Sequence, residues 1–346
     1  MLTGLTPGTE YHYKVTSADG TGNSSNSLDI TFTTTDTIPP VISNINAVPT
    51  DTGAAITWDT DEAATSRVDY GPTAAYENGF QEDTALVTSH SVVLTGLTPG
   101  TVYHYKVTSA DGTGNSSNSL DLTFTTTIAG QQIHYAFEEG SGTIANDSSG
   151  NGNNGTLNGP IWTTGKNGGG LSFDGINDYV SVPRINNDEV SICAWFYKNI
   201  NDITSADAIF GGWRWNTNTQ LREGFDLRFY QLAPDTLEFI VETQNGSGTR
   251  TEKTIRRNLG TSVGAWYHVA GTYYKATGEQ KLYVNGLLVS TRIHPAGNTI
   301  VPLTFYSDMR VGHSRVNNGY FNGIIDDVRL YNRALSDQEV MNLYSQ

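Results

Sequence analysis

The sequence has little of three things that usually narrow a function: cysteine, long apolar runs and positive charge. One cysteine among 346 residues excludes an intramolecular disulfide and a cysteine-based zinc site. No apolar segment reaches the length that a membrane-spanning helix needs. Twenty basic residues stand against thirty-five acidic ones, which gives a net charge of −15. Nucleic acid is therefore an unsuitable partner for this chain.

The acidic charge is concentrated at the beginning of the chain. Residues 1–130 hold three basic residues against fourteen acidic ones, a net of −11, and the remainder has a net of −4. We interpret this acidity as an aid to solubility rather than as a binding surface. Runs that favour helix are scarce, whereas Gly, Thr, Ser, Asn, Tyr and Val are abundant. This composition predicts an all-β protein with many turns, and the length predicts two or more domains.

A long repeat occupies the first third of the chain. Residues 2–35 recur at 94–127, and only Glu10/Val102 and Ile30/Leu122 differ among the thirty-four positions. The offset of 92 residues is the length of one sandwich domain. Only the second copy is complete, so residues 1–35 are predicted to be the truncated C-terminal part of a preceding repeat. Because Met1 aligns with Val93 and a GUG valine codon can start a bacterial gene, we expect further sequence upstream, where a catalytic domain could lie.

Residues 39–127 carry the pattern of the complete repeat. Residues 54–58 alternate and end on Trp58, which we expect in the core, and Tyr103 follows a Pro-Gly turn. This turn and the strand after it resemble the tyrosine corner of a fibronectin type III domain. Together with residues 65–71 and 89–92, they are similar to the variant found near the N-terminus of purple acid phosphatases. The phosphatase machinery is absent, so the resemblance implies only a spacer domain.

The loop at residues 147–155 reads Asp-Ser-Ser-Gly-Asn-Gly-Asn-Asn-Gly and has no apolar or basic side chain. Asp147, Asn151, Asn153 and Asn154 offer side-chain oxygens, and hard oxygen ligands on a flexible loop suit Ca²⁺. Asp326, far away in the sequence, can supply a further carboxylate. The loop does not have the EF-hand pattern, because no Glu falls at the closing position. The alternative is an Asn-Gly-rich surface turn that binds no ion.

From residue 133 onward, short strand-like segments alternate with turns. More than ten such segments in about 215 residues predict a double-sheet jelly roll. Asn285-Gly286 lies between two alternating runs and predicts a two-residue hairpin. Ser336 and Glu339 form a capping-box pattern that opens the one predicted helix, at residues 340–344. We place this domain at residues 131–346.

Seven motifs give this domain a family resemblance. They are Phe137-Glu-Glu-Gly-Ser-Gly142, Asp147-Ser-Ser-Gly-Asn-Gly152, Phe173-Asp-Gly175, Asp178-Tyr-Val180, Trp266-Tyr-His-Val269, Tyr283-Val-Asn-Gly286 and the run from Gly323 to Leu335. As a set they resemble the bacterial laminin-G-like, concanavalin A-like domain. The resemblance implies a carbohydrate-binding or adhesive module. It also implies a structural Ca²⁺ between the loop after the first strand and the closing strand, with Asp147, Asn151, Asn153 and Asp326 as ligands.

Strand alternation predicts where a ligand binds. In residues 225–230, Phe225, Leu227 and Phe229 point to the core, so Asp226, Arg228 and Tyr230 share the opposite face. Aromatic rings stack on the C–H face of a sugar, while Arg and Asp hold hydroxyl or carboxylate groups. The predicted binding residues are Trp213, Arg214, Trp215, Arg222, Asp226, Arg228 and Tyr230. The alternative is that one Trp belongs to the core and the arginines face solvent.

The sequence shows no catalytic centre that we can identify. The Glu-x-Asp-x-x-Glu strand of laminarinase-type glycosidases is absent, and Glu238 and Glu242 would stand about 13 Å apart along a strand. We therefore predict a non-catalytic, calcium-stabilised polysaccharide-binding module on fibronectin-type spacers, within a larger exported bacterial protein that is extracellular or on the cell surface. The arginines favour an acidic or sulfated polymer. The alternative is an adhesion domain that binds a protein, and the sequence leaves the oligomeric state open.

Overall fold

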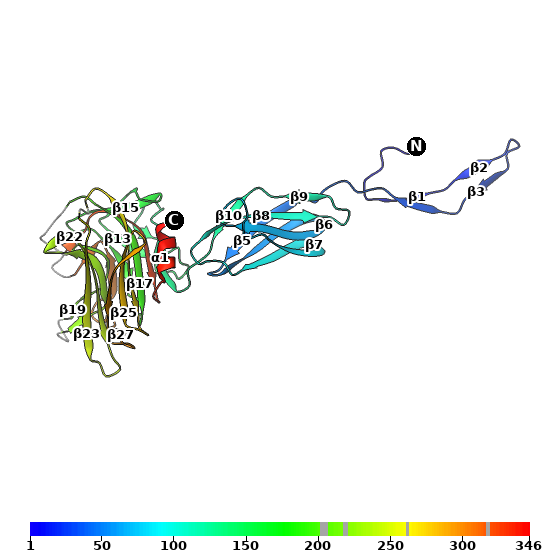
Figure 1. Ribbon diagram of the computed structural model, residues 1–346. Coiled ribbons are helices and arrows are strands. Elements are labelled where there is room, and N and C mark those ends of the chain that lie inside the picture. The colour runs from blue at the N-terminus through cyan, green and yellow to red at the C-terminus, as the bar shows by residue number, and fades with distance from the viewer. Residues whose placement is uncertain (201–206, 217–220, 261–262, 316–318) are drawn as a thin grey trace. The chain divides into compact units, whose positions relative to one another are not determined.

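The computed structural model of the protein describes residues 1–200, 207–216, 221–260, 263–315 and 319–346 (Figure 1). The prediction of an all-β protein is confirmed, since these residues form strands and one short helix, α1 (Asp337–Tyr344). No helix among them is long and apolar enough to cross a membrane. The chain divides into two compact units, Met1–Ile128 and Ala129–Gln346.

Residues 1–35 form four short strands, which pair antiparallel as β1 with β4 and β2 with β3. They are β1 (Glu10–Tyr13), β2 (Thr16–Ala18), β3 (Ser24–Asn26) and β4 (Ile30–Thr33). The backbone N–H of Thr6 donates to the Tyr11 hydroxyl over 2.8 Å, which closes the turn before β1. Large apolar side chains of this segment, Leu28 among them, are exposed.

The complete repeat forms a sheet in the order β10-β8-β6-β5, with β7 on β6 and β9 on β8. Its strands are β5 (Ile42–Pro49), β6 (Gly53–Gly71), β7 (Phe80–Thr95), β8 (Val102–Ala110), β9 (Ser116–Asn118) and β10 (Leu122–Thr125). Trp58 is buried in the core, as predicted, and its indole N–H donates to Ser109 over 2.9 Å. The tyrosine corner is also confirmed, because the N–H of Thr98 donates to the Tyr103 hydroxyl over 3.1 Å.

Two large sheets build the second unit. In the described residues, one runs β14 (Ile161–Thr164), β15 (Gly169–Asp174), β31 (Asn322–Tyr331), β17 (Val190–Lys198), β24 (Trp266–Tyr274), β25 (Glu279–Val284), β26 (Leu287–Ile293), with β11 (Gln131–Tyr135) on β31. The other runs β12 (Ile144–Ala145), β13 (Gly155–Asn158), β16 (Tyr179–Pro183), β28 (Asp308–Val311), β18 (Ala208–Gly211), β21 (Phe225–Tyr230), β22 (Ala233–Gln244), β23 (Arg250–Asn258), with β27 (Thr299–Ile300) on β22. Two short pairs accompany them: β19 (Arg214–Asn216) with β20 (Leu221–Glu223), and β29 (His313–Ser314) with β30 (Gly319–Tyr320).

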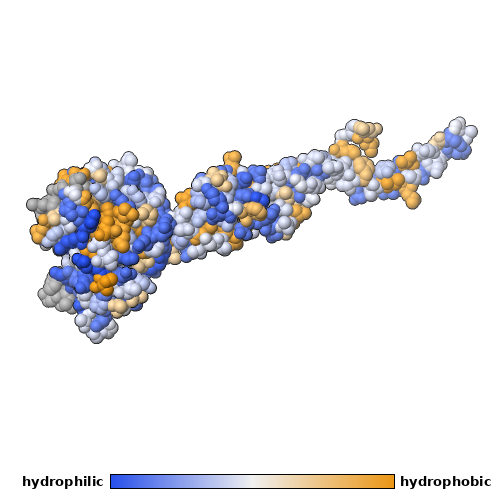
Figure 2. Space-filling view, in the orientation of Figure 1, coloured by the Kyte–Doolittle hydropathy of each residue, from blue (hydrophilic) through white to orange (hydrophobic). Residues whose placement is uncertain are grey.

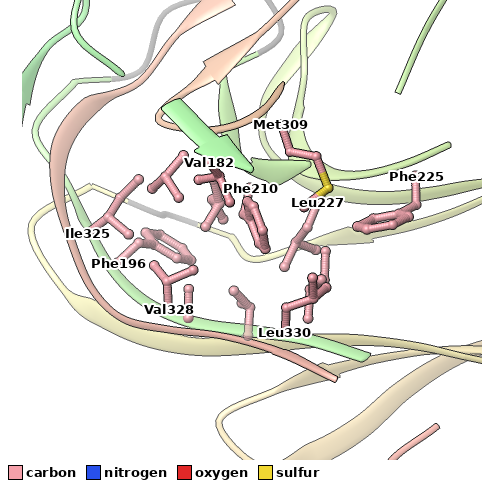
Figure 3. Packing of buried hydrophobic residues seen from close by; sticks show 14 of the residues in the cluster. Val182, Phe196, Phe210, Phe225, Leu227, Met309, Ile325, Val328 and Leu330 are labelled. Carbon is pink, nitrogen blue, oxygen red and sulfur yellow. The ribbon is translucent and has the colours of Figure 1, made fainter. Parts of the chain in front are cut away.

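The core of this unit lies between the two sheets. Figure 3 shows side chains of both sheets pointing toward one another, among them Phe210 and Leu227 from one sheet and Phe196 and Ile325 from the other. All four are at most 1% exposed. Burying a side chain of this size contributes roughly 1.5–3 kcal/mol, so the packed layer is the main source of stability. The predicted double-sheet jelly roll is confirmed.

Local signals explain two connections. Asn285 and Gly286 have φ of 48° and 76°, the left-handed pair that a tight two-residue hairpin needs, and they join β25 to β26. The Ser336 side chain accepts the Glu339 N–H, and the Glu339 side chain accepts the Ser336 N–H, so the predicted capping box opens α1. The sequence prediction missed β23, because its charged residues do not give the apolar alternation of a half-buried strand. It is the last strand of the sheet order, where charged side chains are common.

Candidate functional site

A hollow of about 220 Å³ lies over β21, β22 and β23, on the face of the sheet that is turned away from the core. Four predicted binding residues line it: Trp213, Arg222, Arg228 and Tyr230. The other lining residues are Gln231, Glu238, Ile240, Glu252, Thr254 and Arg256. Strand alternation predicted this face correctly for β21, because Leu227 and Phe229 are in the core.

Strand register brings three charged side chains into one row. Arg228 is opposite Glu238 between β21 and β22, and Glu238 is opposite Arg256 between β22 and β23. Residues directly opposite in an antiparallel sheet project to the same face. Glu238 therefore lies between two arginines, with Arg228 Nε 3.0 Å from Oε2 and Arg256 Nε 2.9 Å from Oε1.

Two residues of this row are buried, and the third is accessible to solvent. The side chains of Glu238 and Arg228 are 1% and 8% exposed, whereas that of Arg256 is 48% exposed. A buried carboxylate costs free energy unless it is paired and hydrogen-bonded, and Glu238 uses both oxygens in this way. The Arg256 guanidinium is thereby held in place at the surface of the hollow, 3.9 Å from the centre of the Tyr230 ring.

Trp213 differs from our expectation. Its ring is only 6% exposed, and the guanidinium groups of Arg228 and Arg222 lie 4.8 Å and 5.2 Å from its centroid. The ring face is therefore occupied by cations rather than open to stack on a sugar. Its buried indole N–H has no hydrogen-bond partner among the described residues. Trp213 thus lines the hollow as a buried ring beneath two guanidinium groups.

Asp226 lies beneath the hollow rather than in its lining. It is 1% exposed, it accepts a hydrogen bond from Ser314 over 3.2 Å, and its Oδ2 is 3.7 Å from Arg228 Nη1. Burial raises the pKa of this carboxyl to about 7. A Cβ on Gly211, which faces Asp226 across the β18–β21 pair, would clash with its carboxyl oxygen. Asp226 therefore positions Arg228 and does not itself face a ligand, contrary to our prediction.

The remaining predicted residues belong to the hairpin next to the hollow. Trp215 pairs with Arg222 between β19 and β20, while the side chains of Arg214 and Trp215 lie outside the described part of the structure. Arg222 forms an ion pair with Glu252 of β23. The guanidinium of Arg222 is thereby directed toward the sheet.

Sequence reasoning missed the contributions of β22 and β23. Glu238 entered it only as a carboxylate without a catalytic partner, and Arg256, which lies in β23, was not among the predicted binding residues. The sequence of β23 offers no alternation that could have found them, since Ile255 is its one apolar residue. In the structure Ile255 is buried, which places Thr254 and Arg256 on the face opposite the core.

The loop at residues 147–155 is held by its own hydrogen bonds. The Asp147 carboxylate accepts the backbone N–H groups of His134, Ser149 and Asn153 at 2.9, 3.0 and 2.9 Å. The side-chain amides of Asn151 and Asn153 donate to backbone carbonyls of β11. The Asp147 carboxylate is thus already engaged by three N–H groups, so as a ligand it fits a cation poorly.

Asp326 has different surroundings from the loop. Its Oδ2 accepts the N–H groups of Lys166 and Asn167 at 2.9 and 3.0 Å, and no contact in the described residues joins it to Asp147. The structure therefore does not bring the four predicted calcium ligands together, because β31 directs Asp326 to the turn before β15. The other oxygen, Oδ1, is buried without a hydrogen-bond partner, and burial raises the pKa of this carboxyl to about 6. Asp326, Asn167 and Glu138 line one hollow, and this orphan oxygen is the feature that suits a cation.

Comparison with known families identifies both domains. Residues 173–341 match the Concanavalin A-like lectin/glucanases superfamily, and residues 40–127 match the Purple acid Phosphatase, N-terminal domain. The protein therefore combines a fibronectin type III-like domain with a laminin G-like jelly roll of the concanavalin A-like superfamily, as the sequence motifs indicated.

Two curated proteins are similar over part of the chain. Endoglucanase B from Cellulomonas fimi is 38% identical over 139 residues, which cover 36% of this chain and 13% of that protein. Pentraxin-related protein PTX3 from Mus musculus is 24% identical over 160 residues, 43% of this chain and 37% of that protein. The chain thus spans well under half the length of either relative.

Among solved structures, domain 4 of AbnA, an extracellular GH43 arabinanase from Geobacillus stearothermophilus in complex with arabinotriose, has a TM-score of 0.46 and 19% identity, covering 62% of this chain and 98% of that one. The CBM40 of the Ruminococcus gnavus IT-sialidase, bound to α2,3 sialyllactose, has a TM-score of 0.40 and 16% identity, covering 51% and 96%. Both are distant similarities.

Proposed function

We propose that the jelly roll is a non-catalytic carbohydrate-binding module, and that a polysaccharide binds in the hollow over β21, β22 and β23. The observation that carries this proposal is the fixed row of Arg228, Glu238 and Arg256 beside the Tyr230 ring. Sugar hydroxyls both donate and accept hydrogen bonds, so a wall of guanidinium edges, carboxylate oxygens and an aromatic ring complements them. Because register and burial hold these groups in place, little conformational entropy is lost when a sugar binds.

The charge of the hollow bears on which polymer binds. Arg228 and Arg256 are paired with Glu238, and Arg222 is paired with Glu252. This pairing neutralises much of the positive charge on which our preference for an acidic or sulfated polymer was based. A neutral polysaccharide therefore belongs in the test on equal terms with an acidic one.

Affinity gel electrophoresis against a panel of neutral and acidic polysaccharides tests the proposal. We expect one polysaccharide to retard the protein, and Arg256→Ala or Tyr230→Ala to reduce the retardation. Tyr274→Ala is the matched control, because Tyr274 is 42% exposed on β24 of the other sheet. If no polysaccharide retards the protein, the proposal fails and the alternative of a protein-binding adhesion domain is favoured.

We also propose that Ca²⁺ stabilises the jelly roll. The buried, unpartnered Oδ1 of Asp326 supports this proposal. Asn167 and Glu138 line the same hollow and offer an amide and a carboxylate oxygen, which are ligand types that Ca²⁺ accepts. An ion that binds only the folded state stabilises it by about 2.7 kcal/mol at one hundred times its dissociation constant. Its role would be structural, so removal of the ion should lower stability rather than block the sugar site.

We further propose that the protein acts outside the bacterial cell, as part of a longer exported protein. The combination of a spacer domain with a binding domain supports this arrangement. Immunodetection in culture medium and washed cells tests it, and detection only inside the cells would contradict it.

A further inference from the structure

A second pair of carboxyls lies beside the row built on Glu238. Along β22, Glu238, Ile240 and Glu242 share one face of the strand, and the first two line the hollow. Glu242 is directly opposite Glu252 of β23, which also lines the hollow. Glu242 itself is 5% exposed and is not part of the lining. Two like charges placed directly opposite each other in a sheet repel, so this pair is unfavourable when both carboxyls are ionised.

The two carboxyls differ in their partners. Glu252 forms an ion pair with the guanidinium of Arg222. The guanidinium of Arg250 donates to the backbone carbonyl of Arg222. Both cations are thus directed to other acceptors, and Oε2 of Glu242 is buried without a hydrogen-bond partner in the described residues. A buried carboxylate without a partner is costly, so Glu242 is the member of the pair that holds a proton.

The surroundings of Glu242 determine when it loses this proton. Burial raises the pKa of Glu242 to about 7, and the charge of Glu252 raises it as well. The charges of Arg250 and Arg222 act in the opposite direction. Among the described residues, these three are the charged groups that face Glu242 from the strands packed against it, β20 and β23. Glu242 is therefore neutral below about pH 7 and negative above it.

The protonation of Glu242 changes the net charge of the hollow. Three arginines and two glutamates line it, which leaves one positive charge in surplus. Ionised Glu242 cancels this charge. Asp226, buried beneath the hollow, adds another negative charge when it ionises, and Arg250 adds the same positive charge in every state. Buried charges are screened little by salt, so this change acts on a ligand in the hollow.

We propose that Glu242 makes the hollow selective for acidic polysaccharides, because it accepts a carboxylated or sulfated sugar when protonated and repels it when ionised. This inference rests on the proposed function, since it requires that a polysaccharide binds in the hollow. Carboxyl groups of a sugar titrate near pH 4, and sulfate groups stay charged, so the protein alone changes charge around pH 7. Hydrophilic residues cover much of the jelly-roll surface visible in Figure 2, which suits a polar polymer.

Isothermal titration calorimetry on either side of the Glu242 pKa, at about pH 5.5 and about pH 8.5, tests the inference. The acidic probes are polygalacturonate and dextran sulfate, and their neutral counterparts are methyl-esterified galacturonan and dextran. We expect an acidic probe to bind at the lower pH and to bind at least about fivefold more weakly at the higher pH. The neutral counterparts should show no such dependence.

Three variants assign the effect to Glu242. Glu242→Gln keeps the shape of the side chain but stays neutral, so the change with pH should fall below about twofold. Asp226→Asn should retain a larger change than Glu242→Gln does, although Asp226 titrates in the same range. Glu279→Gln, on β25 of the other sheet, is the matched control and should depend on pH as the wild type does.

A measurement on the wild type covers the case that Glu242→Gln does not fold. By linkage, a bound acidic probe should raise the midpoint at which the Glu242 carboxyl carbon titrates in ¹³C NMR spectra. An unchanged midpoint would contradict the inference.

The outcomes separate this inference from the proposed function. Equal affinity for an acidic probe at both pH values, a dependence that Glu242→Gln retains, or binding of neutral polysaccharides alone would overturn the inference and leave the proposed function intact. If neither acidic nor neutral polysaccharides bind, both fail.

Discussion

Glu238 is the residue on which the geometry of the sugar site depends most. Its carboxylate is 1% exposed and holds Arg228 and Arg256 from opposite sides. Breaking a buried charge pair leaves an uncompensated charge and typically costs about 3–5 kcal/mol, whereas an exposed pair contributes about 0–1 kcal/mol. The two carboxylates that line the hollow, Glu238 and Glu252, should therefore differ sharply on mutation.

We predict that Glu238→Gln lowers the free energy of unfolding of the jelly roll by about 3 kcal/mol. Glu252→Gln, which loses the more exposed pair with Arg222, should lower it by less than about 1 kcal/mol. Urea unfolding curves of the two variants measure both values. Equal effects would show that the buried row does not hold the site.

Asp226 makes stability depend on pH. Burial raises its pKa from 3.8 to about 7, so the folded state favours the protonated carboxyl. Its contribution to stability is fully present below about pH 4 and is lost as the pH rises through about 7. Between pH 5 and pH 8 the wild type should lose unfolding free energy relative to Asp226→Asn, by up to about 1.4 kcal/mol per pH unit. A difference that stays constant over this range would contradict the assignment.

At the residue scale the sequence predicted faces better than contacts. The period of two in residues 225–230 was enough to separate Arg228 and Tyr230 from the core. The pairing of Arg228 with Glu238 and Arg256 depends on strand register, which a single strand does not reveal. The burial of Trp213 under two arginines depends on the β19–β20 hairpin and on β21, so its sequence neighbours alone pointed to an open ring.

At the scale of elements, the position of the closing strand β31 explains why Asp326 makes no contact with Asp147. It carries Asp326 to the turn at residues 165–167, while Asp147 is engaged by backbone N–H groups around its own loop. The loop that the sequence analysis describes as flexible is a turn held by hydrogen bonds to Asp147. Which carboxylate approaches it could not be predicted, because that depends on the order of strands in the sheet.

We predict that a chelator lowers the melting temperature of the jelly roll by several degrees, at about 2–4 °C per kcal/mol of lost ion binding. Asp326→Asn should abolish this response. Asp147→Ala should lower the melting temperature with and without chelator, because three N–H groups lose their acceptor. A melting curve that chelator leaves unchanged in the wild type would exclude the ion.

Strand β23 could not be predicted from the alternation of apolar and polar residues. Its sequence, Arg-Thr-Glu-Lys-Thr-Ile-Arg-Arg-Asn, has one apolar residue, so nothing in it suggests a half-buried strand. Pairing of its whole length, Arg250–Asn258, with β22 makes it a strand. The hairpin at Asn285-Gly286 and the capping box at Ser336 were predictable, because backbone conformation and local hydrogen bonds determine both.

At the scale of the whole molecule, the two compact units should behave independently in unfolding. No residue of 1–35 belongs to a hydrophobic core, and the boundary between the two compact units falls at Ile128. We predict that deletion of residues 1–35 leaves the melting temperature of the jelly roll and its polysaccharide binding unchanged, as differential scanning calorimetry and affinity electrophoresis would show. A large loss of either would mean that the segment packs on another part of the protein.

The family resemblance anticipated the fold because its motifs include turns and the closing strand that fix the path of the chain, such as Asn285-Gly286 and β31. It did not anticipate the site, which is built from side chains on the outward face of three adjacent strands. That face is free to vary without cost to the core, so a fold does not specify a ligand.

The most direct test of the account is the dissociation constant for the polysaccharide that retards the protein, measured by isothermal titration calorimetry. Arg256→Ala and Tyr230→Ala should each weaken binding at least about tenfold, a loss of about 1.4 kcal/mol. Tyr274→Ala, on the other sheet, should bind as the wild type does. If Arg256→Ala and Tyr230→Ala bind as tightly as the wild type, the polysaccharide does not bind in this hollow and the central claim is wrong.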